Sequence, residues 1–120
     1  MIMQGSGLPG LDHAEAIAKL ETDGTVILNS GGADLGTGLD TISAKAVKEV
    51  LKLPMEKITV VSGDTDSCVF DTGAYASSGT FFSGNASLLA AKKLKEKILA
   101  EAALQMNEKI GNLDDRAPGE

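Results

Sequence analysis

Two glycine-rich segments carry the residue types in this sequence that could bind a ligand. The first runs from Ser30 to Thr41, and the second includes Gly73 to Thr80. Each follows a short apolar or β-branched run and precedes a helical pattern, so each is predicted to join a strand to a helix N-terminus. Backbone N–H groups and the positive end of a helix dipole favour anions at such a position. The two segments are therefore the candidate binding loops.

The turn Gly36-Thr37-Gly38 in the first loop has two interpretations. Its glycines can simply supply unusual φ angles at a tight turn into a helix, or they can let the backbone approach a phosphate or a flat polar heterocycle. The turn is not a Walker loop, because no Gly-Lys-Ser/Thr follows, and Thr41 stands where the dinucleotide-binding fingerprint requires a third glycine. The pattern alone leaves both interpretations open.

The second loop ends with hydroxyl side chains at the predicted start of a helix. Ser77, Ser78 and Thr80 can cap that helix, which is typically worth about 1 kcal/mol. The same hydroxyls and the neighbouring N–H groups can instead bind an oxyanion such as phosphate. One loop can fulfil both roles through different residues.

The remaining polar side chains give little support for a metal site or a nucleophile. Asp64, Asp66 and Asp71 could bind a hard cation, but aspartates in turns more often accept hydrogen bonds from nearby backbone N–H groups. His13 and Cys68 are the single histidine and the single cysteine. Protein-bound zinc or copper draws on several such ligands, so we expect no metal bound by side chains.

Composition limits the class of protein. The chain has 120 residues, a hydrophobic fraction of 42% and a formal net charge of −6, which suits one small globular domain. The acidic balance argues against nucleic acid or an anionic membrane surface as a partner. No apolar run approaches the roughly 18 residues of a membrane span, and the first residues lack the basic segment of a secretory signal. We expect a cytoplasmic protein.

The order of elements predicts an α+β fold, in which a small mixed sheet with a β-hairpin carries two amphipathic helices on one face. Asp23-Gly24 between two short runs is a strong hairpin signal. Pro54 ends the first helical pattern. The expected elements are strands 1–4, 13–21, 25–29 and 58–62, helices 39–51 and 80–106, and a long polar loop 63–79. The apolar positions of the second helix are Phe82, Ala86, Leu89, Ala90, Leu94, Ile98 and Ala102.

The segment Met1–Gln4 reads as the end of a strand with no turn or cap before it. It predicts that the 120 residues are a piece of a larger protein. We expect residues 1–106 to form a partial domain and residues 107–120, which offer little to bury, to form a flexible tail.

Several motifs occur together and in a fixed order along the chain. They are Gly31–Thr41, Leu53–Ile58, Gly63–Asp66, Asp71–Gly73, Ala76–Thr80 and Gly84–Ala86. With the loop Gly5–Gly10 and the Asp23-Gly24 hairpin, this combination resembles the molybdenum hydroxylases, the family of xanthine dehydrogenase and aldehyde oxidase. The resemblance covers about residues 1–103 and is to part of the large subunit that binds the molybdopterin cofactor.

The resemblance implies that both loops contact molybdopterin. The Gly36–Gly38 turn would face the pterin and the molybdenum end, and the Ala76–Thr80 loop would hold the pterin or its phosphate. The dithiolene sulfurs of the cofactor would hold the metal, so no residue is assigned as a metal ligand, and none is assigned as catalytic. Thr37 stands where the family commonly has the longer Gln. The implied cofactor-binding residues are Gly36, Thr37, Gly38, Ala76, Ser77, Ser78, Gly79 and Thr80.

The resemblance also implies an activity and partners. The parent protein would be an oxidoreductase that hydroxylates a heterocycle or an aldehyde with oxygen from water. The isolated chain would supply only a partial cofactor cradle, so we expect it to lack the cofactor and to be inactive. Its partners would be the remainder of the molybdenum-binding subunit and iron–sulfur and flavin subunits or domains, with self-association through an exposed helix face as a further expectation. Two alternatives stay open: a non-catalytic folding or interaction module with the same scaffold, and a small phosphate-binding domain.

Overall fold

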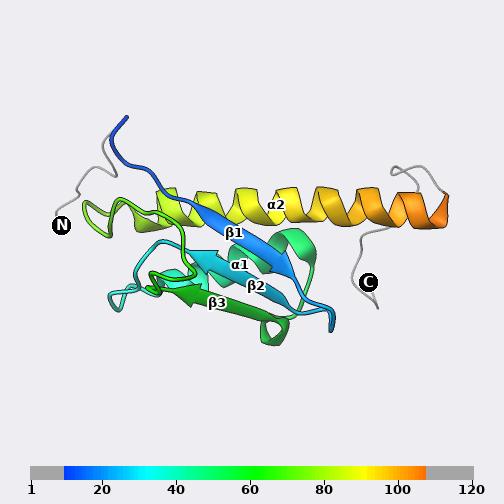
Figure 1. Ribbon diagram of the computed structural model, residues 1–120. Coiled ribbons are helices and arrows are strands. Elements are labelled where there is room, and N and C mark those ends of the chain that lie inside the picture. Colours follow the sequence, from blue (N-terminus) through cyan, green and yellow to red (C-terminus); the bar gives the residue numbers. More distant parts are fainter. Residues whose placement is uncertain (1–9, 108–120) are drawn as a thin grey trace.

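The computed structural model describes residues 10–107 (Figure 1). The predicted strand 1–4 and the predicted tail beyond Asn107 lie outside these described residues. The elements follow the predicted order, with one added turn of 3-10 helix. They are β1 Ala16–Leu20, β2 Val26–Ser30, α1 Leu39–Leu51, η1 Met55–Lys57, β3 Ile58–Ser62 and α2 Gly79–Met106.

The three strands form a mixed sheet in the order β1-β2-β3. β1 pairs with β2 in antiparallel fashion, and β2 pairs with β3 in parallel. The predicted hairpin between β1 and β2 is confirmed. Gly24 has a φ of 81°, and the Asp23 carboxylate accepts hydrogen bonds from the N–H and the hydroxyl of Thr25, so the turn is fixed by its own side chains.

The strand predicted at 13–21 is shorter than expected, because its two ends take part in other structures. The backbone N–H of Glu21 donates to Thr25 and belongs to the hairpin turn. At the other end, His13 and Glu15 pair with residues 70–72 of the long loop: Glu15 N–H donates to Phe70 O and Thr72 N–H donates to His13 O, both at 2.9 Å. The long loop is therefore attached to the segment before β1.

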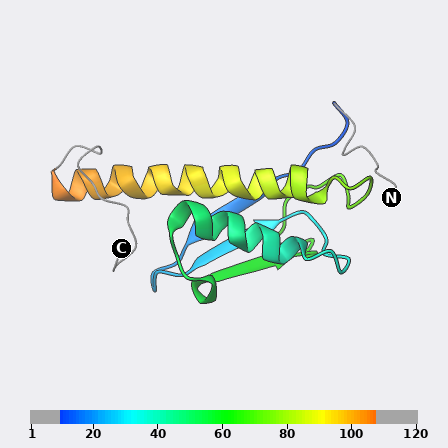
Figure 2. The ribbon, with the colours of Figure 1, turned by 180° about the vertical axis from the view of Figure 1, so that it is seen from behind.

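Both helices lie on the same face of the sheet, as Figures 1 and 2 show from opposite sides. Alternate β2 residues point toward the helices, so Val26 and Leu28 are fully buried, and Val47 of α1 and Ala91 of α2 meet them in the core. Burying each large aliphatic side chain contributes roughly 1.5–3 kcal/mol. The predicted α+β class and the placement of the helices are confirmed.

The packing face of α2 differs from the predicted one. Ala90 and Leu94 do pack against the core, but Leu89 is 57% exposed. The buried positions in the first half of the helix are small residues, namely Ser83, Gly84, Ser87 and Ala91. Small side chains let two helix backbones approach closely, and these residues therefore form the contact surface of α2. A hydropathy pattern does not identify them, because serine and glycine are not hydrophobic.

Glycine is required at positions 31 and 32, directly after β2, because neighbouring atoms leave no room for a Cβ atom. The backbone φ angle is not the reason at these two positions. A Cβ atom on Gly31 would lie 2.3 Å from the carbonyl oxygen of Val69, and one on Gly32 would lie 2.8 Å from the Leu39 side chain. The backbone of the long loop crosses over Gly31, and the start of α1 packs on Gly32. These contacts bring the two candidate loops together.

The two loops and the start of α2 lie at one end of the domain, beyond the carboxyl ends of the parallel strands β2 and β3 (left in Figure 1). Ligands of open sheets with helices commonly bind at this position. Among the described residues, no helix has the length and apolar character needed to cross a membrane.

Candidate functional site

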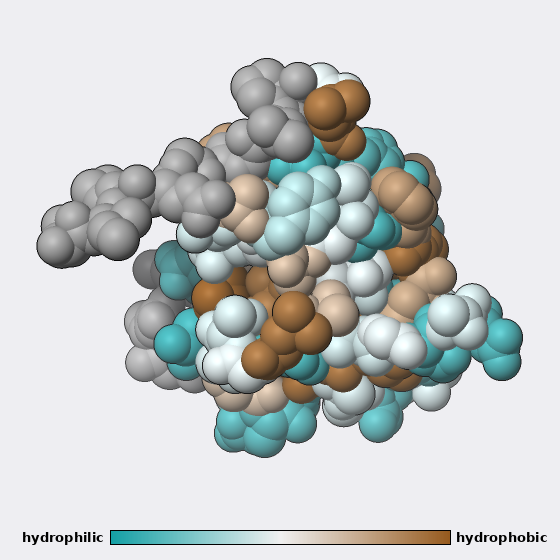
Figure 3. All heavy atoms as spheres, turned by 90° about the vertical axis from the view of Figure 1, so that its left-hand side faces the viewer, coloured by the Kyte–Doolittle hydropathy of each residue, from teal (hydrophilic) through white to brown (hydrophobic). Residues whose placement is uncertain are grey.

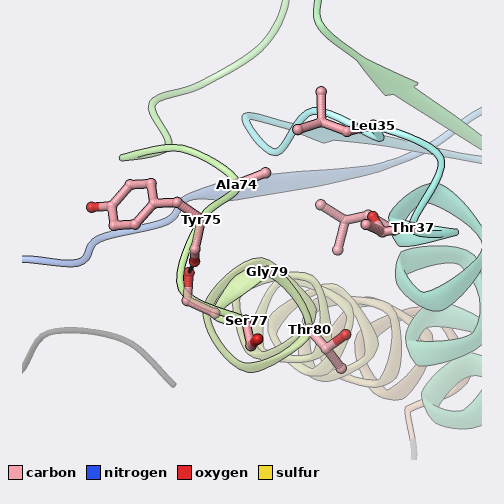
Figure 4. A pocket seen from close by; sticks show the side chains of 9 residues that line it. Leu35, Thr37, Ala74, Tyr75, Ser77, Gly79 and Thr80 are labelled. Carbon is pink, nitrogen blue, oxygen red and sulfur yellow. Dashed lines mark hydrogen bonds between the residues drawn. The ribbon is translucent and has the colours of Figure 1, made fainter. Parts of the chain in front are cut away.

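The two predicted loops line one pocket. Its volume is about 370 Å³, and it lies between the turn before α1 and the first turn of α2 (Figure 4). Figure 3 shows this end of the molecule, where hydrophobic atoms are exposed among polar ones. The lining residues are Leu35, Thr37, Leu39, Ala74, Tyr75, Ser77, Ser78, Gly79 and Thr80. Five of the eight predicted site residues are in this set.

The other three predicted residues shape the same loops without lining the pocket. Gly36 and Gly38 have φ angles of 93° and 76°, and nothing lies within 4 Å of a Cβ added to either one. Glycine is needed at these two positions for its left-handed backbone, which supports the first of the two interpretations of the turn. Ala76 also has a left-handed φ, of 51°.

The expectation that the first loop offers bare N–H groups to an anion is wrong for three of its donors. The Asp34 carboxylate accepts hydrogen bonds from the N–H of Gly36 at 2.9 Å, of Gly38 at 3.0 Å and of Asp40 at 3.3 Å. A side chain of the loop itself thus occupies the position where an external anion would bind. Its negative charge also complements the positive end of the α1 dipole.

The charge of Asp34 is stabilised by these contacts. Desolvation raises the pKa of the carboxyl group, but the N–H groups of Asp40, Gly38 and Gly36 lower it by more, so that the pKa lies below its ordinary value. Asp34 is therefore ionised at neutral pH, and it makes this side of the pocket unfavourable for a second negative charge.

The second loop enters α2 through an unusual backbone turn. Ala76 and Ser77 are consecutive left-handed residues, with φ angles of 51° and 56°. The backbone N–H and the hydroxyl of Ser78 both donate to the Tyr75 carbonyl, at 3.1 and 2.6 Å. This hydroxyl is directed back into the loop, and the Ser78 side chain is nearly fully buried.

The predicted side-chain cap of α2 is absent. Ser78 is the N-cap residue, but no side chain accepts a hydrogen bond from the helix start, and the first turn holds no acidic residue. Within the described part of the chain, no acceptor is assigned to the N–H groups of Gly79 and Thr80, and the first such bond is that of Phe82 to Ser78. The start of α2, unlike that of α1, leaves its donors and its dipole available.

The pocket thus has two chemically different sides. Leu35, Leu39 and Ala74 provide apolar surface, while Ser77, Thr80 and the first turn of α2 provide hydrogen-bond donors. An elongated ligand with a flat ring and an anionic group at one end fits this arrangement, because the ring can pack on leucine and the anion can bind the helix start.

Two of the three aspartates of the long loop, Asp64 and Asp71, have the turn roles predicted as the alternative to metal binding. Asp64 accepts from Asp66 N–H and from the Ser67 hydroxyl. Asp71 accepts from Gly73 N–H and from the Ser83 hydroxyl. In residues 10–107 there is no group of three or more His, Cys, Asp or Glu side chains that could hold a metal ion.

Five residues of the site were missed by sequence reasoning. Leu35, Leu39, Ala74 and Tyr75 line the pocket, and Asp34 orders the first turn. The signal for Asp34 is its position two residues before a glycine, which is typical of an Asx turn. The four lining residues carry no comparable local signal, because they come together only when the two loops meet.

A small mixed sheet with two helices and a two-sided pocket defines a ligand-binding domain of the α+β class. The family model of the molybdopterin cofactor-binding domain matches residues 1–117. The chain belongs to this family, and the predicted resemblance to the molybdenum hydroxylases is confirmed.

Relatives of known description agree with this assignment. The chain is 54% identical over 119 residues to the probable hypoxanthine oxidase XdhD of Escherichia coli, and it spans 12% of that protein. It is 37% identical over 105 residues to a xanthine dehydrogenase molybdenum-binding subunit from the same species, of which it spans 14%. The match covers 99% of this chain in the first case and 87% in the second. The chain is therefore comparable to a small part of each of these proteins.

Solved structures share the fold. The CO dehydrogenase of Oligotropha carboxidovorans superimposes with a TM-score of 0.79 and 29% identity, over 85% of this chain and 13% of that one. The aldehyde oxidoreductase of Desulfovibrio desulfuricans gives a TM-score of 0.72 with 33% identity, over 78% of this chain and 11% of that one. The small mixed sheet with two helices is thus the fold of part of these two enzymes.

Proposed function

We propose that the pocket between the two loops is part of the site that binds molybdopterin. The observation that supports this most directly is that the segments 35–39 and 74–80, far apart in the sequence, line one pocket. The residues in contact with the cofactor or shaping its site are Gly36, Thr37, Gly38, Ala76, Ser77, Ser78, Gly79 and Thr80.

The charges of the two loops favour one orientation of the ligand. Asp34 places a negative charge in the first turn, whereas the first turn of α2 has neither a cap nor an acidic residue. The anionic group of the cofactor therefore binds near Ser77 and Thr80, and the flat pterin packs toward Leu35 and Leu39. When bound, the cofactor supplies the redox chemistry of its molybdenum, and these residues hold and orient it.

The whole protein is proposed to be an oxidoreductase that hydroxylates a heterocycle or an aldehyde with oxygen from water. The names of the relatives support this, since they include a probable hypoxanthine oxidase and a xanthine dehydrogenase subunit. Residues 1–106 form the cofactor-binding part within this protein, which acts in the cytoplasm, and the chain by itself is inactive.

The remainder of a molybdenum-binding subunit is the proposed first partner, followed by iron–sulfur and flavin subunits or domains. Apolar residues on the sheet face opposite the helices support the remainder of the subunit as a partner. Ile17 is 52% exposed there, and Ile27 and Val61 on the neighbouring strands are only partly buried. Self-association through α2 is a second proposal, supported by the exposure of Leu89 and Leu104.

A charge substitution at the start of α2 tests the proposed site. Thr80→Glu places a carboxylate in the pocket, where it repels the phosphate of the cofactor. The matched control is Thr41→Glu, which makes the same change in the first turn of α1 at an exposed position outside the pocket. Acidic residues are favourable in the first turn of a helix, so both variants should fold.

The chain and its variants are produced together with the remainder of the proposed molybdenum-binding subunit in a host that synthesises molybdopterin, and the fluorescence of the oxidised pterin released on denaturation is measured per chain. We expect Thr80→Glu to lower the pterin content at least tenfold and Thr41→Glu to keep it within twofold. Equal pterin content in the two variants would contradict the site. If the wild-type protein contains no pterin but is stabilised by inorganic phosphate, the small phosphate-binding domain is favoured. If it contains no pterin and phosphate does not stabilise it, the non-catalytic module is favoured.

A further inference from the structure

Tyr75 connects the pocket to a distant part of the chain. Its backbone belongs to the pocket-lining loop, but its ring points away from Thr37 and from the pocket interior (Figure 4). The phenol hydroxyl donates a hydrogen bond of 2.7 Å to the Asp12 carboxylate, 63 residues earlier in the sequence. Because Asp12 lies in the segment that leads into β1, this bond joins the second loop to the edge of the sheet.

The backbone next to Tyr75 needs a restraint. The following residues, Ala76 and Ser77, are both left-handed, a conformation that is unfavourable for residues with a Cβ atom and that persists only where the surroundings impose it. Both hydrogen bonds of Ser78 in this turn converge on the Tyr75 carbonyl. The position of Tyr75 thus sets the position of the strained turn and of the first residues of α2.

The other attachments of the loop end before this turn. Thr72 is held to His13 by backbone and hydroxyl hydrogen bonds, and Asp71 is held to α2 through the Ser83 hydroxyl at 2.7 Å. Among the described residues, the side-chain hydrogen bond that ties residues 73–78 to another part of the chain is the one from Tyr75 to Asp12.

Gly73 makes room for this arrangement. It has a φ of 131°, and a Cβ atom added there would lie 3.4 Å from the Tyr75 ring. The ring therefore lies against the backbone of Gly73 while its hydroxyl reaches Asp12. The ring, the turn and the carboxylate form one connected unit at the margin of the pocket.

We propose that the Tyr75–Asp12 pair is a latch that positions residues 74–80, and with them the start of α2, for binding the anionic end of the cofactor. Tyr75 and Asp12 are positioning residues in this proposal, because the Tyr75 hydroxyl points away from the pocket and Asp12 is not one of its lining residues. The inference rests on the proposed cofactor site for its functional meaning, and on the hydrogen bonds and the left-handed turn for its structural content.

Four variants of the protein test the latch. Tyr75→Phe and Asp12→Ala remove the hydrogen bond from either side, and the double variant removes both groups. Asp12→Asn retains an acceptor oxygen and should restore the bond. The matched control is Asp23→Ala, which removes an aspartate that accepts two hydrogen bonds in the hairpin turn, away from the loop.

The first readout is amide hydrogen exchange, which does not depend on the cofactor. We expect exchange in residues 74–80 to rise about three- to tenfold in Tyr75→Phe and Asp12→Ala, the change that loss of one hydrogen bond produces, with exchange in β2 and α1 unchanged. The double variant should exchange no faster than either single one, and Asp12→Asn should stay within twofold of the wild type. Unchanged exchange in Tyr75→Phe, or the same rise in Asp23→Ala, would overturn the latch.

The second readout is pterin content per chain after production in a host that makes the cofactor. It should fall about three- to tenfold in the variants with a broken latch and be retained in Asp12→Asn and in Asp23→Ala. If the wild type itself carries no pterin, the cofactor site fails while hydrogen exchange still decides the latch. If exchange rises but pterin content stays at the wild-type level, the pair is only a structural contact and its role in binding is refuted.

Discussion

Asp34 shows how a single side chain can decide which of two similar loops keeps its N–H groups available to an anion. Both loops lead from a parallel strand to a helix N-terminus. In the first, the Asp34 carboxylate accepts hydrogen bonds from Gly36, Gly38 and Asp40. In the second, no side chain caps the helix. The loops are therefore not equivalent, although their sequences suggest the same role.

The lowered pKa of Asp34 gives a test by pH. A carboxyl group whose folded-state pKa lies below its unfolded value of about 3.9 contributes stability above that value and loses it as the pH falls through the folded pKa. We expect Asp34→Asn to be less stable than the wild type in urea unfolding at pH 7, and the difference to shrink as the pH falls below about 4. A difference that stays constant down to pH 2 would show that the charge of Asp34 contributes nothing.

Gly31 and Gly79 provide a second test at the residue scale. Gly31→Ala should destabilise the protein by about 3 kcal/mol, because its Cβ would overlap the backbone of Val69 and Phe70 and that backbone cannot rotate away. Gly79→Ala should change the free energy of unfolding by less than about 0.5 kcal/mol, since the added Cβ would lie 3.8 Å from the Leu39 side chain. Equal effects in denaturant unfolding would show that the loop does not cross Gly31 closely.

At the scale of elements, the contact between α1 and α2 is made largely by small and polar residues. Ser43 and Ala44 of α1 are buried, as are Ser83, Gly84 and Ser87 of α2. The helix axes can approach closely there, and the end of α2 that bears the free N–H groups is held beside the first loop. The helix that presents the proposed anion site is thus positioned by close packing and not by a large apolar stripe.

Replacing either of two buried serines by alanine should change the stability of the protein, in opposite directions for the two positions. Ser43 is 1% exposed, and its hydroxyl has no hydrogen-bond partner among the described residues. Ser43→Ala therefore removes an unsatisfied polar group and should stabilise the protein by about 1 kcal/mol. The Ser83 hydroxyl donates to Asp71 at 2.7 Å, so Ser83→Ala should destabilise it by about 1–3 kcal/mol. Thermal or urea unfolding of both variants measures this, and loss of stability in Ser43→Ala would contradict an unpaired hydroxyl.

The elements themselves could be predicted because their signals are local. Asp23-Gly24 marks the hairpin, Pro54 marks the end of α1, and the apolar period of α1 agrees with the burial of Leu39 and Val47. The packing face of α2 could not be predicted from hydropathy, because close helix contact selects small residues such as Gly84 and Ser87. The shortening of β1 also depended on a long-range pairing with residues 70–72.

The same distinction applies to the site. The two loops could be identified from motifs, and the structure brings both to one pocket, which five of the eight predicted residues line. The contact of these residues with a cofactor stays a prediction. Two features of the site could not be predicted from the sequence. The hydrogen bonds from the first loop to Asp34 depend on the backbone path of that loop, and the bond from Tyr75 to Asp12 spans 63 residues. Asp12 precedes the sheet in the chain and reaches the pocket margin only in the folded domain.

At the scale of the whole molecule, the chain is a cofactor-binding domain that spans 12% to 14% of the relatives with which it was compared. Its pocket lies at one end of the sheet, and its open sheet face retains exposed apolar residues such as Ile17. Both features suit a domain that contributes one wall of a larger active site. The central claim is that this wall binds the anionic end of molybdopterin at the start of α2.

The crystal structure of the cofactor-loaded protein tests this claim most directly, through the distance from the cofactor phosphate to the backbone nitrogens of the first turn of α2. The phosphate should lie within hydrogen-bond distance of the N–H of Gly79 or Thr80, with the pterin toward Leu35 and Leu39. A cofactor phosphate bound at the Gly36–Gly38 turn, or a cofactor that does not enter the pocket, would contradict the proposed site.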